Sequence, residues 1–578
     1  MVFGLVAAAC GGNSGGGNSA NGGSTVTTAN EANLKPQYGG DATFALEADT
    51  TGGYCLSEAQ LAIAGIQVAR SLYDTLTVPT ANGTYVPFLA QSVTPNATFT
   101  TWTINLRPGI TFSDGTPLNA ADVRDNLNNY RGQADPGDPK PLVTGELFPF
   151  VFASVTSVKA TGPMTVTVTM SKPWAAFPAS LYSYGRLGIM GEAQMHDPKK
   201  CYINLVGTGP FQFKGNWVPN SHMVVVKNPH YWRKDKDGNA LPYLNQITFQ
   251  TVLETSNLIG NLQSKTSDLA DTDNDIAIPK FITAAKNGTM HLLESDTDTE
   301  IAYTLLNEKT EPFNHYSARA AFAYAVNREE YNKLRQGGLL KSASGPFAPG
   351  VIGNLPATGA NGTNLPDYDV AKAKQYAAQY KQETGHTLTF QYGTTNDADS
   401  LTSALLIKSY LEAAGMKVSI RQTDQSQYIN DAIQGTYQAL AWRNHPGFDP
   451  DTQTIWWTCS APAPNPQPAV FPVAKKCDNP VNFSGFNDAV INNDMAEARG
   501  TTDVAKRTQL YESVNKEFAK QLWELWGYYV LWTVPSQTNV HGINNLALPT
   551  ATSVNAVGDK PFLGLASGID PAPLWMSK

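Results

Sequence analysis

The sequence predicts an α/β protein built from two or three lobes, on three observations. The chain has 578 residues, which is more than one hydrophobic core usually supports. Residues 99–127 show strand-type alternation, then turn signals, then the start of a helix. Residues 388–420 show a strand, a helix and a second strand, which fits a right-handed βαβ unit.

The first of these units can be followed along the chain. Apolar and polar residues alternate over residues 99–106, which predicts a strand with one buried face. Turn signals that contain glycine follow at residues 108–115. Asn119 suits a helix N-cap, and Asp122 three residues later supports a helix that begins there. A second strand is predicted over residues 165–170, where apolar residues alternate with threonines.

The second unit and two further helices lie in the C-terminal half. Residues 388–392 and 418–420 alternate as strands, and residues 401–414 between them have the pattern of a helix. Apolar residues four apart predict a core-packed helix over residues 504–526. A similar pattern predicts another helix over residues 318–334.

The N-terminus is typical of an exported, lipid-anchored protein. A short apolar run, residues 2–9, precedes Cys10, and a tract rich in Gly, Ser and Asn, residues 11–30, follows it. The run is too short to span a bilayer, and its small residues suit signal-peptide cleavage. The pattern resembles a bacterial lipobox with Cys10 as the acylated residue. The tract predicts a flexible tether with a root-mean-square span of about 25 Å.

The composition excludes several classes of protein. The chain is 42% hydrophobic and 16% charged, and no apolar stretch is long enough to cross a membrane. A net charge of −8 without a run of like charges argues against a nucleic-acid surface. We find no nucleophile elbow, zinc helix, P-loop or dinucleotide fingerprint. We therefore expect a protein without enzyme activity, cofactor or metal, and a secreted hydrolase is the remote alternative.

Four cysteines remain when Cys10 is set aside, and an even number in an exported chain predicts two disulfides. Three pairings are open. Sequence neighbourhood favours Cys459 with Cys477, which leaves Cys55 with Cys201. A zinc site is disfavoured because no CxxC spacing and no histidine accompany these cysteines.

Seven segments match a known family in the family's own order. The most specific is residues 102–118, Trp-Thr-Ile-Asn-Leu-Arg-Pro-Gly-Ile-Thr-Phe-Ser-Asp-Gly-Thr-Pro-Leu. The other six are residues 39–46, 72–76, 207–211, 228–232, 241–244 and 318–329. Together they resemble the extracytoplasmic solute-binding proteins of peptide-type ABC transporters, family 5, the oligopeptide- and dipeptide-binding class.

This resemblance implies a periplasmic-binding-protein-like fold, type II and cluster C, with two main lobes that close on a cleft and an extra subdomain. The implied division is a signal-peptide remnant at residues 1–9, the anchor and tether at 10–35, lobe I at 36–68, 206–298 and 537–578, the extra subdomain at 69–205, and lobe II at 299–536. The motifs themselves are expected to be structural. Gly109, Gly115, Gly207 and Gly209 should serve turns, and Trp102 and Trp232 should lie in the core.

The resemblance also implies the function. We expect a lipid-anchored, monomeric receptor on the outer face of the cell membrane, which captures peptides and delivers them to an ABC permease. Its partners would be the solute, the permease and the ATPase subunits that hydrolyse ATP, and its only membrane contact would be the lipid anchor. An oligosaccharide, a nickel complex or another small solute is the alternative ligand.

The segment that resembles the family's ligand strand is residues 441–451. In the dipeptide and oligopeptide binders an Asp ahead of the Asp-Pro pair holds the α-ammonium group of the ligand. Here that stretch is Asn444-His445-Pro446, without a carboxylate, so recognition of a free amino terminus stays open. Candidate ligand contacts in and after this segment are Trp442, Arg443, Asn444, His445, Asp449 and Trp456.

Several candidates have more than one interpretation. Arg443 suits either a ligand carboxylate or a salt bridge between lobes. Trp456 and its neighbour Trp457 suit either a ligand floor or core packing. In the first lobe, Asp49 and Tyr54 follow the opening strand and are expected to face the cleft. Tyr392, on the strand at residues 388–392, completes the set of candidate ligand-binding residues.

Overall fold

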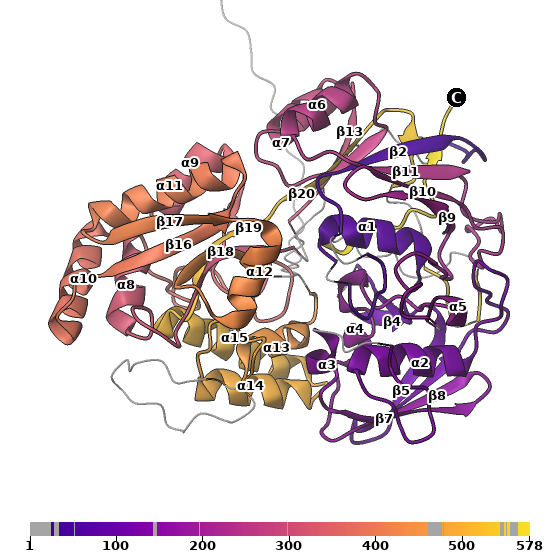
Figure 1. The fold of residues 1–578 in the computed structure, drawn as a ribbon, viewed down its shortest axis with the longest axis horizontal. Coiled ribbons are helices and arrows are strands. Elements are labelled where there is room, and N and C mark those ends of the chain that lie inside the picture. The colour runs from indigo at the N-terminus through magenta and orange to yellow at the C-terminus, as the bar shows by residue number, and fades with distance from the viewer. Residues whose placement is uncertain are drawn as a thin grey trace, which may run out of the picture.

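The chain forms three β-sheet bodies, two of them side by side and the third below one of these (Figure 1). The structure is a computed structural model. It describes residues 25–27, 34–50, 53–59, 61–81, 83–142, 147–195, 197–296, 299–444, 447–459, 477, 479–543, 548–550, 552–554 and 565–578.

The first body is built on an eight-stranded sheet with the order β1-β13-β20-β12-β2-β11-β10-β9. Its strands are β1 (Thr25–Thr27), β2 (Asp41–Leu46), β9 (Phe211–Val218), β10 (His222–Lys227), β11 (Gln246–Thr251), β12 (Leu269–Asp271), β13 (His291–Ser295) and β20 (Trp532–Ser536). Strand β2 is parallel to both β11 and β12, and the other pairs are antiparallel. We call this the eight-stranded body.

Helices cover both faces of this sheet. Helices α6 (Thr255–Gln263) and α7 (Ile278–Lys286) pack on one face, in an apolar cluster that includes Ala45 of β2. Helix α1 (Ile63–Leu72) shares the larger apolar cluster with Phe44, the neighbouring residue of the same strand. Successive side chains of a strand point to opposite faces, so a central strand buried on both sides needs apolar residues in succession.

The second body is built on a six-stranded sheet with the order β15-β19-β14-β18-β16-β17. Its strands are β14 (Ile301–Leu306), β15 (Lys341–Ser342), β16 (Thr389–Thr395), β17 (Lys417–Thr423), β18 (Ala439–Asn444) and β19 (Leu525–Tyr529). Its helices are α8 (Tyr316–Ala325), α9 (Arg328–Gln336), α10 (Val370–Thr384), α11 (Ala398–Ala413), α12 (Gln425–Gln434), α13 (Thr454–Trp457), α14 (Ala489–Arg499) and α15 (Val504–Gln521). We call this the six-stranded body.

The third body is a four-stranded antiparallel sheet with the order β5-β6-β8-β7. Its strands are β5 (Ala90–Pro95), β6 (Thr101–Leu106), β7 (Val155–Gly162) and β8 (Thr165–Met170), and its helices are α2 (Ala120–Arg131), α3 (Phe148–Val151), α4 (Phe177–Ser180) and α5 (Glu192–Met195). We call this the four-stranded body. It shares one continuous apolar core with the eight-stranded body, whereas the six-stranded body has its own core.

Short elements complete the described chain. Two short antiparallel pairs join β3 (Thr77–Pro79) with β4 (Tyr85–Pro87), and β21 (Val540–His541) with β22 (Trp575–Met576). Three 3₁₀ helices are η2 (Ser183–Gly185), η3 (Pro450–Gln453) and η4 (Leu565–Ser567). Within the described ranges, no helix has the length and hydropathy that a bilayer span requires.

Most of the predicted elements are confirmed. In β6 the residues Trp102, Ile104 and Leu106 are buried and their neighbours are half-exposed, as the alternation predicts. Helix α2 begins after Asn119 with a complete capping box to Asp122. Strands β16 and β17 are parallel and α11 connects them, so the predicted βαβ unit is present.

Two helix predictions are wrong in extent. The helix predicted over residues 318–334 is two helices, because the chain leaves the helical conformation at Val326 and the side chain of Asn327 caps α9. The helix predicted over residues 504–526 ends at Gln521, since Leu522 adopts a left-handed conformation and the following apolar run forms β19.

The two predicted disulfides are confirmed with the favoured pairing, Cys55 with Cys201 and Cys459 with Cys477. Trp102 and Trp232 are buried in the core, as predicted. Of the four glycines predicted to serve turns, Gly109 and Gly115 have positive φ angles. Gly207 and Gly209 lie instead against the backbone of Leu72, so a Cβ atom at either position would clash with that backbone.

Candidate ligand-binding site

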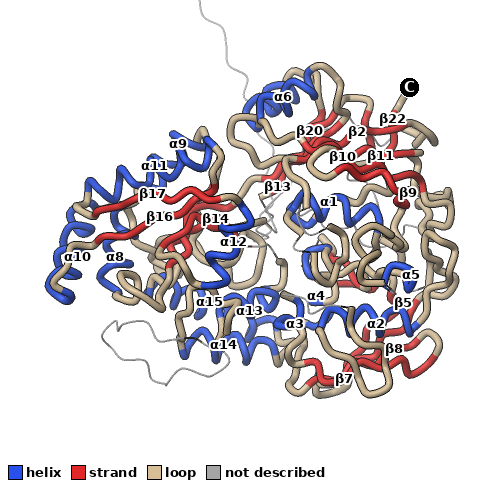
Figure 2. The backbone as a smooth tube through the Cα atoms, in the orientation of Figure 1, coloured by secondary structure: helices blue, strands red, loops and turns tan. Residues whose placement is uncertain are grey.

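The eight-stranded and six-stranded sheets meet where the chain crosses between them twice. The chain enters β14 from β13 through Thr299 and Glu300, and residues 530–531 lead back from β19 to β20. The two crossings are hydrogen bonded to each other: Val530 N–H donates to Glu300 O (3.0 Å), and Thr299 Oγ1–H donates to Val530 O (2.6 Å). Figure 2 shows these crossings as the connection between the two groups of strands. We call this region the junction.

Three carboxyl groups of the eight-stranded sheet lie at the junction. Glu47 directly follows β2, Asp271 ends β12 and Asp273 comes two residues later. The two strands are parallel neighbours, with Asp271 paired to Leu46, so their carboxyl ends meet at the same edge of the sheet. Thr272 Oγ1–H donates to Glu47 Oε2 (3.4 Å), which joins the two strand ends. Crevices beyond the carboxyl ends of strands are the usual ligand sites of open α/β sheets.

The six-stranded sheet contributes Arg443, near the end of β18. Its guanidinium forms an ion pair with Asp273 and lies 3.7 Å from Oε2 of Glu300, the residue that directly precedes β14. The Arg443 side chain is nevertheless 42% exposed. The salt bridge between the two bodies, one of the two interpretations open for this residue, is therefore present, and solvent still reaches the cation.

We call this group of carboxyls, Glu47, Asp271, Asp273 and Glu300, the junction cluster. Burial raises the pKa of three of them, Glu47, Asp271 and Glu300. Desolvation raises the pKa of Asp271 to about 8 and that of Glu300 to about 7. Desolvation, with Asp273 and Asp271 nearby, raises the pKa of Glu47 well above its usual range. Burial works against the charged form of Arg443, but Asp273 and the other acids raise its pKa further and keep it protonated.

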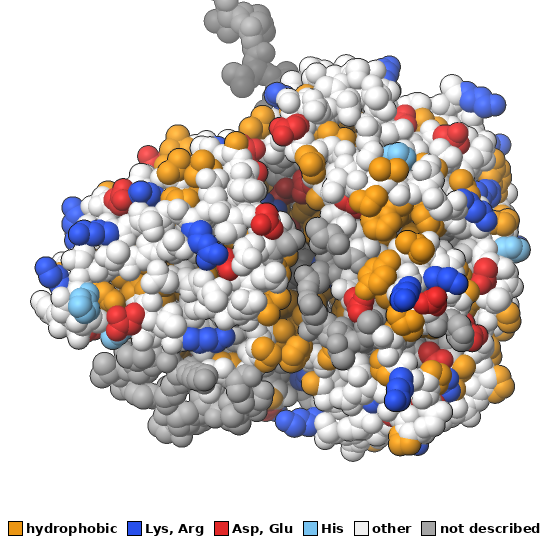
Figure 3. All heavy atoms as spheres, in the orientation of Figure 1, with side chains coloured by type: hydrophobic (Ala, Val, Ile, Leu, Met, Phe, Trp, Pro, Cys, Tyr) orange, Lys and Arg blue, Asp and Glu red, His pale blue; other side chains and the backbone are white. Residues whose placement is uncertain are grey.

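The surface is hollowed between the six-stranded and eight-stranded bodies, and acidic side chains lie on the wall of this hollow (Figure 3). A second ion pair crosses from one body to the other. Arg335 of α9 lies 3.9 Å from Asp275, two residues beyond Asp273. Charged groups from both bodies thus face each other across the junction.

The aromatic candidates lie together on the other side of β18. Trp442 points away from its neighbour Arg443 and stacks on Tyr428 of α12, with ring centroids 5.6 Å apart. Phe483 contacts both Trp442 (5.8 Å) and Trp456 (5.7 Å). Both tryptophans are half-buried. Trp457 is buried against Phe518 and Trp526 in the core of the six-stranded body.

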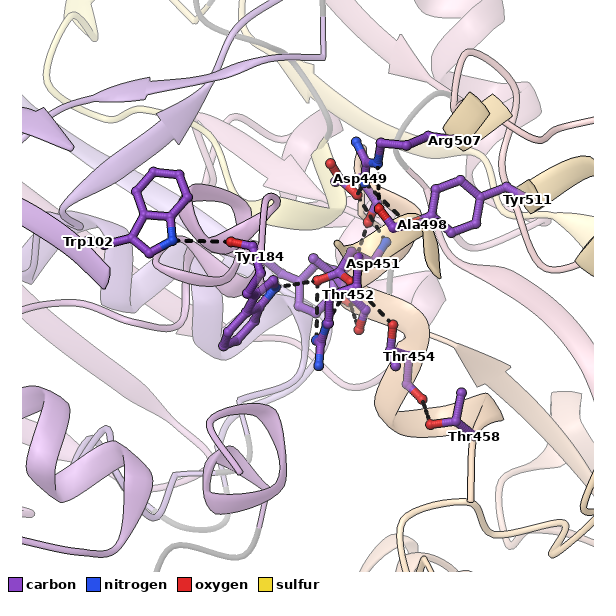
Figure 4. A network of polar contacts seen from close by, with 12 residues as sticks. Trp102, Tyr184, Asp449, Asp451, Thr452, Thr454, Thr458, Ala498, Arg507 and Tyr511 are labelled. Carbon is purple, nitrogen blue, oxygen red and sulfur yellow. Dashed lines mark hydrogen bonds and ion pairs between the residues drawn. The ribbon is translucent and has the colours of Figure 1, made fainter. Parts of the chain in front are cut away.

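Asn444, Asp449 and Asp451 contribute to a polar network that joins the six-stranded and four-stranded bodies. Figure 4 shows the part of this network around Asp449 and Asp451. The Asp451 carboxylate is fully buried, accepts a hydrogen bond from Trp174 Nε1–H (2.6 Å) and pairs with Arg499 (2.8 Å). Asp449 pairs with Arg507 and caps η3.

Asn444 is buried and donates to Gln453, whose own amide donates to Tyr184 Oη (3.1 Å). Tyr184 lies in η2, which contacts α1. The network therefore connects the segment after β18 to side chains far away in sequence, and its polar groups have protein partners.

The two candidates after β2 stabilise the β9–β10 hairpin. Asp49 accepts hydrogen bonds from Trp217 Nε1–H (3.2 Å) and Asn220 N–H (2.8 Å). Tyr54 is buried and packs edge-on against the ring of Trp217, at 5.4 Å. Tyr392 is 4% exposed and packs against Phe322 inside the six-stranded body. His445 and Cys10 lie outside the described residues.

The carboxyls of the junction cluster are the residues that the sequence analysis missed. The local signal is a run of polar residues, 271–273, directly after an apolar strand. The significance of that signal depends on the parallel pairing of β2 with β12, which brings together residues more than 220 positions apart. Of the sequence candidates, Arg443 alone is brought into direct contact with this cluster among the residues described.

Comparisons with known proteins agree with the architecture. The family model of the bacterial extracellular solute-binding proteins, family 5 Middle, matches residues 84–466. The glutathione-binding protein GsiB of Pectobacterium atrosepticum is 24% identical over 458 residues, which are 79% of this chain and 82% of that protein.

Two solved structures share the fold. One is the binding protein AgaA of A. tumefaciens R10 in complex with agropinic acid, with a TM-score of 0.76, 21% identity and coverage of 93% of this chain and 99% of that one. The other is the periplasmic binding protein DppA of Helicobacter pylori in complex with the peptide STSA, with a TM-score of 0.75, 19% identity and coverage of 94% and 99%. The predicted type II periplasmic-binding-protein fold is confirmed, and the chain belongs to family 5 of the bacterial extracellular solute-binding proteins, which bind solutes for ABC importers.

Proposed function

We propose that this family 5 receptor captures peptides in the hollow at the junction and delivers them to the permease of an ABC importer, whose own subunits hydrolyse ATP. We further propose that the protein is a monomer, tethered through Cys10 to the outer face of the cell membrane. The eight-stranded body is lobe I, the six-stranded body is lobe II, and the four-stranded body is the extra subdomain. Two bounds of the sequence analysis change with this division, because β1, inside the predicted tether, and β20, inside the predicted lobe II, belong to the eight-stranded sheet.

One observation carries the peptide proposal: groups of opposite charge face each other across the junction. The carboxyls Glu47 and Asp273 come from the eight-stranded sheet, and Arg443 comes from the six-stranded sheet. A zwitterionic solute that lies beside this ion pair satisfies both signs of charge, with its carboxylate on the planar Arg443 fork and its cation on the carboxyls. Contacts to both bodies favour the closed state, which is how a receptor of this kind converts binding into closure.

The oligosaccharide alternative depends on exposed aromatic faces. Trp442, the nearest tryptophan to Arg443 in sequence, stacks its ring on Tyr428, and Phe483 contacts it from another side. These contacts use ring surface that a sugar would need. The charged lining therefore favours a peptide over a sugar.

A thermal-shift panel tests the peptide proposal on the full chain carrying Cys10→Ser. The panel contains di-, tri- and longer peptides, oligosaccharides and nickel chelates, because a ligand that binds only the native state raises the melting temperature. We expect a rise with peptides. A rise with oligosaccharides or nickel chelates alone would contradict the peptide proposal and leave the receptor assignment intact.

The anchor is tested separately by detergent phase partition of the chain expressed in a bacterium that lipidates exported proteins. We expect the native chain in the detergent phase and the Cys10→Ser variant in the aqueous phase, because the acyl chains supply the apolar surface. Equal partition of the two proteins would contradict lipidation at Cys10.

A further inference from the structure

The junction cluster carries more negative charge than the described protein groups around it neutralise. The ionisable groups that face it or belong to it are Glu47, Asp271, Asp273, Asp275, Glu300, Arg443 from β18, Arg335 from α9, Tyr528 from β19 and Arg186 after η2. Five carboxyls thus share three guanidinium groups. Carboxyls without a cation in a dry site keep their protons, since neutralisation costs less than burial of a bare charge.

Asp271 shows this imbalance most directly. Its side chain is 1% exposed. One oxygen, Oδ2, accepts a hydrogen bond from Gln67 Nε2–H (2.8 Å), whereas the other, Oδ1, has no hydrogen-bond partner among the described residues. The residue lies at the end of β12, where its backbone pairs with Leu46, and it feels the charges of Asp273 and Glu300. A buried oxygen without a partner in a polar site marks a place where a donor from outside is accommodated.

Glu47 and Asp273 are less buried than Asp271 and Glu300. Both residues are intermediate in exposure, although the side chain of Asp273 is only 10% exposed. Asp273 already accepts the guanidinium of Arg443, which shows that the site has the geometry for a charge-assisted hydrogen bond to a nitrogen cation. Glu47 accepts only a long hydrogen bond from Thr272 among the bonds that the structure shows for its side chain.

We propose that Glu47 and Asp273, backed by Asp271 and Glu300, form a subsite for an organic ammonium group of the solute, beside Arg443. This inference rests on the proposed function, because it takes the hollow at the junction to be the solute site. An organic cation is favoured over a metal ion, since no three His, Cys, Asp or Glu side chains among the described residues are placed to share one.

The subsite predicts that binding is coupled to proton release. An ammonium group favours the ionised carboxylates, so carboxyls that hold a proton in the empty site lose it when the cation enters. The affinity for a cation therefore rises with pH as Glu300, with a pKa of about 7, and Asp271, with a pKa of about 8, ionise.

Three probes separate this subsite from the peptide proposal. Trialanine has one ammonium and one carboxylate, N-acetyltrialanine lacks the ammonium, and putrescine carries two ammonium groups without a peptide bond. Each is titrated by calorimetry at up to about 10 mM into the full chain carrying Cys10→Ser, with sodium chloride at equal ionic strength as the reference. We expect trialanine and putrescine to bind and N-acetyltrialanine to bind at least about tenfold more weakly.

Two variants test the residues. Glu47→Gln leaves the ion pair between Arg443 and Asp273 in place, so it removes charge without unlinking the two bodies. We expect Glu47→Gln and Asp273→Asn each to weaken putrescine binding by about fivefold or more. Asp237→Asn is the matched control, because this exposed residue carries the same charge and pairs with Lys236 outside the cluster. It should change the affinity by less than about twofold.

The pH dependence gives an independent readout. Putrescine amines, like that of lysine, stay protonated from about pH 6 to about pH 8.5, so a rise in affinity over this range reports the carboxyls. Calorimetry in two buffers of different ionisation enthalpy should show that protons are released on binding.

Each outcome decides between the two proposals. Equal binding of trialanine and N-acetyltrialanine, or unchanged binding in both variants, overturns the ammonium subsite while the peptide receptor stands. Binding of putrescine without either peptide supports the subsite and contradicts the peptide proposal. Absence of binding by both trialanine and putrescine overturns the subsite.

Discussion

At the residue scale, glycine is needed at positions 207 and 209 because the backbone there lies close to the backbone of Leu72. A Cβ atom on Gly207 would lie 2.2 Å from the carbonyl oxygen of Leu72, and one on Gly209 would lie 2.4 Å from its carbonyl carbon. Gly209 N–H donates to that same carbonyl (2.9 Å), so the two backbones are held in register. The sequence analysis expected turns here, because glycine occurs both where a turn needs a positive φ angle and where two backbones approach closely. Space against a segment 135 positions away is not visible in a local pattern.

Gly207→Ala should therefore destabilise the protein by at least about 2 kcal/mol, because backbone atoms rather than a flexible side chain meet the added methyl. Urea unfolding followed by circular dichroism measures the change. The matched control is Gly260→Ala, whose Cβ would enter open space within α6. That variant should gain about 0.5 to 1 kcal/mol, and equal effects of the two substitutions would contradict the packing argument.

At the scale of elements, helix α2 follows directly from its sequence. Asn119 Oδ1 accepts from the N–H groups of Ala121 (2.7 Å) and Asp122 (3.3 Å), and Asp122 Oδ2 accepts from Asn119 N–H (2.9 Å). Each of these bonds joins residues at most three positions apart, so the local sequence is enough to predict where the helix begins. The helix predicted at residues 504–526 failed for the opposite reason: an apolar run continues past Leu522, and periodicity alone does not distinguish a buried helix from a buried strand.

Asn119→Ala should cost about 1 kcal/mol of stability, since it leaves two N–H groups at the start of α2 without their acceptor. Asn119→Asp retains an acceptor of the same length and should stay within about 0.5 kcal/mol of the native chain. The free energy of unfolding in urea compares the three proteins. A loss of stability in Asn119→Asp as large as that in Asn119→Ala would contradict a capping role.

At the scale of the whole molecule, Trp174 links the four-stranded and six-stranded bodies. Its indole N–H donates to Asp451, and its ring carries the guanidinium of Arg499 at 4.3 Å. Ala175 N–H also donates to Arg499 O (2.7 Å). The six-stranded body thus contacts the eight-stranded body at the junction and the four-stranded body at Trp174. The sequence analysis did not predict the contact at Trp174, because no local pattern pairs residue 174 with residue 451.

Trp174→Phe should remove the hydrogen bond to Asp451, cost about 1 to 2 kcal/mol and increase the population of more open molecules. Small-angle X-ray scattering measures the opening as a larger radius of gyration. Trp102→Phe is the matched control, because its indole bonds to Trp174 O (3.1 Å) within the four-stranded body. It should lower stability without opening the molecule, and identical scattering of the two variants would contradict a role for Trp174 in holding the bodies together.

The stability of the whole molecule should depend on pH through its buried carboxyls. Burial raises the pKa of Asp74 to about 7, that of Glu300 to about 7 and that of Asp271 to about 8. In the unfolded chain these groups ionise near pH 4, so between about pH 4 and pH 8 the native state holds protons that the unfolded state has lost. The free energy of unfolding therefore falls as the pH rises over this range.

Melting temperatures should be higher at about pH 5 than at about pH 8. Further acidification should reverse the trend, because Arg233 lowers the pKa of Asp570 and protonation breaks this ion pair. Asp74→Asn keeps an acceptor for Trp232 and removes one titrating group, so it should flatten the dependence. A melting temperature that rises steadily from pH 5 to pH 8 would contradict the argument.

The sequence by itself determined what short-range interactions decide. Alternation defined β6 and β8, the capping pattern defined the start of α2, and the motifs identified the family. It also brought Arg443 forward as a candidate and left its partner open. These features depend on residues a few positions apart, whose geometry follows from the chain itself.

Only the tertiary structure decided the composition of the junction cluster. Glu47, Asp271, Asp273, Glu300 and Arg443 lie on different strands and crossings, and they come together because β2 pairs with β12 and the chain crosses twice between two sheets. Burial then sets which of these carboxyls hold protons. Both effects are properties of the packed molecule, because neither strand pairing over hundreds of residues nor desolvation is encoded in a local pattern.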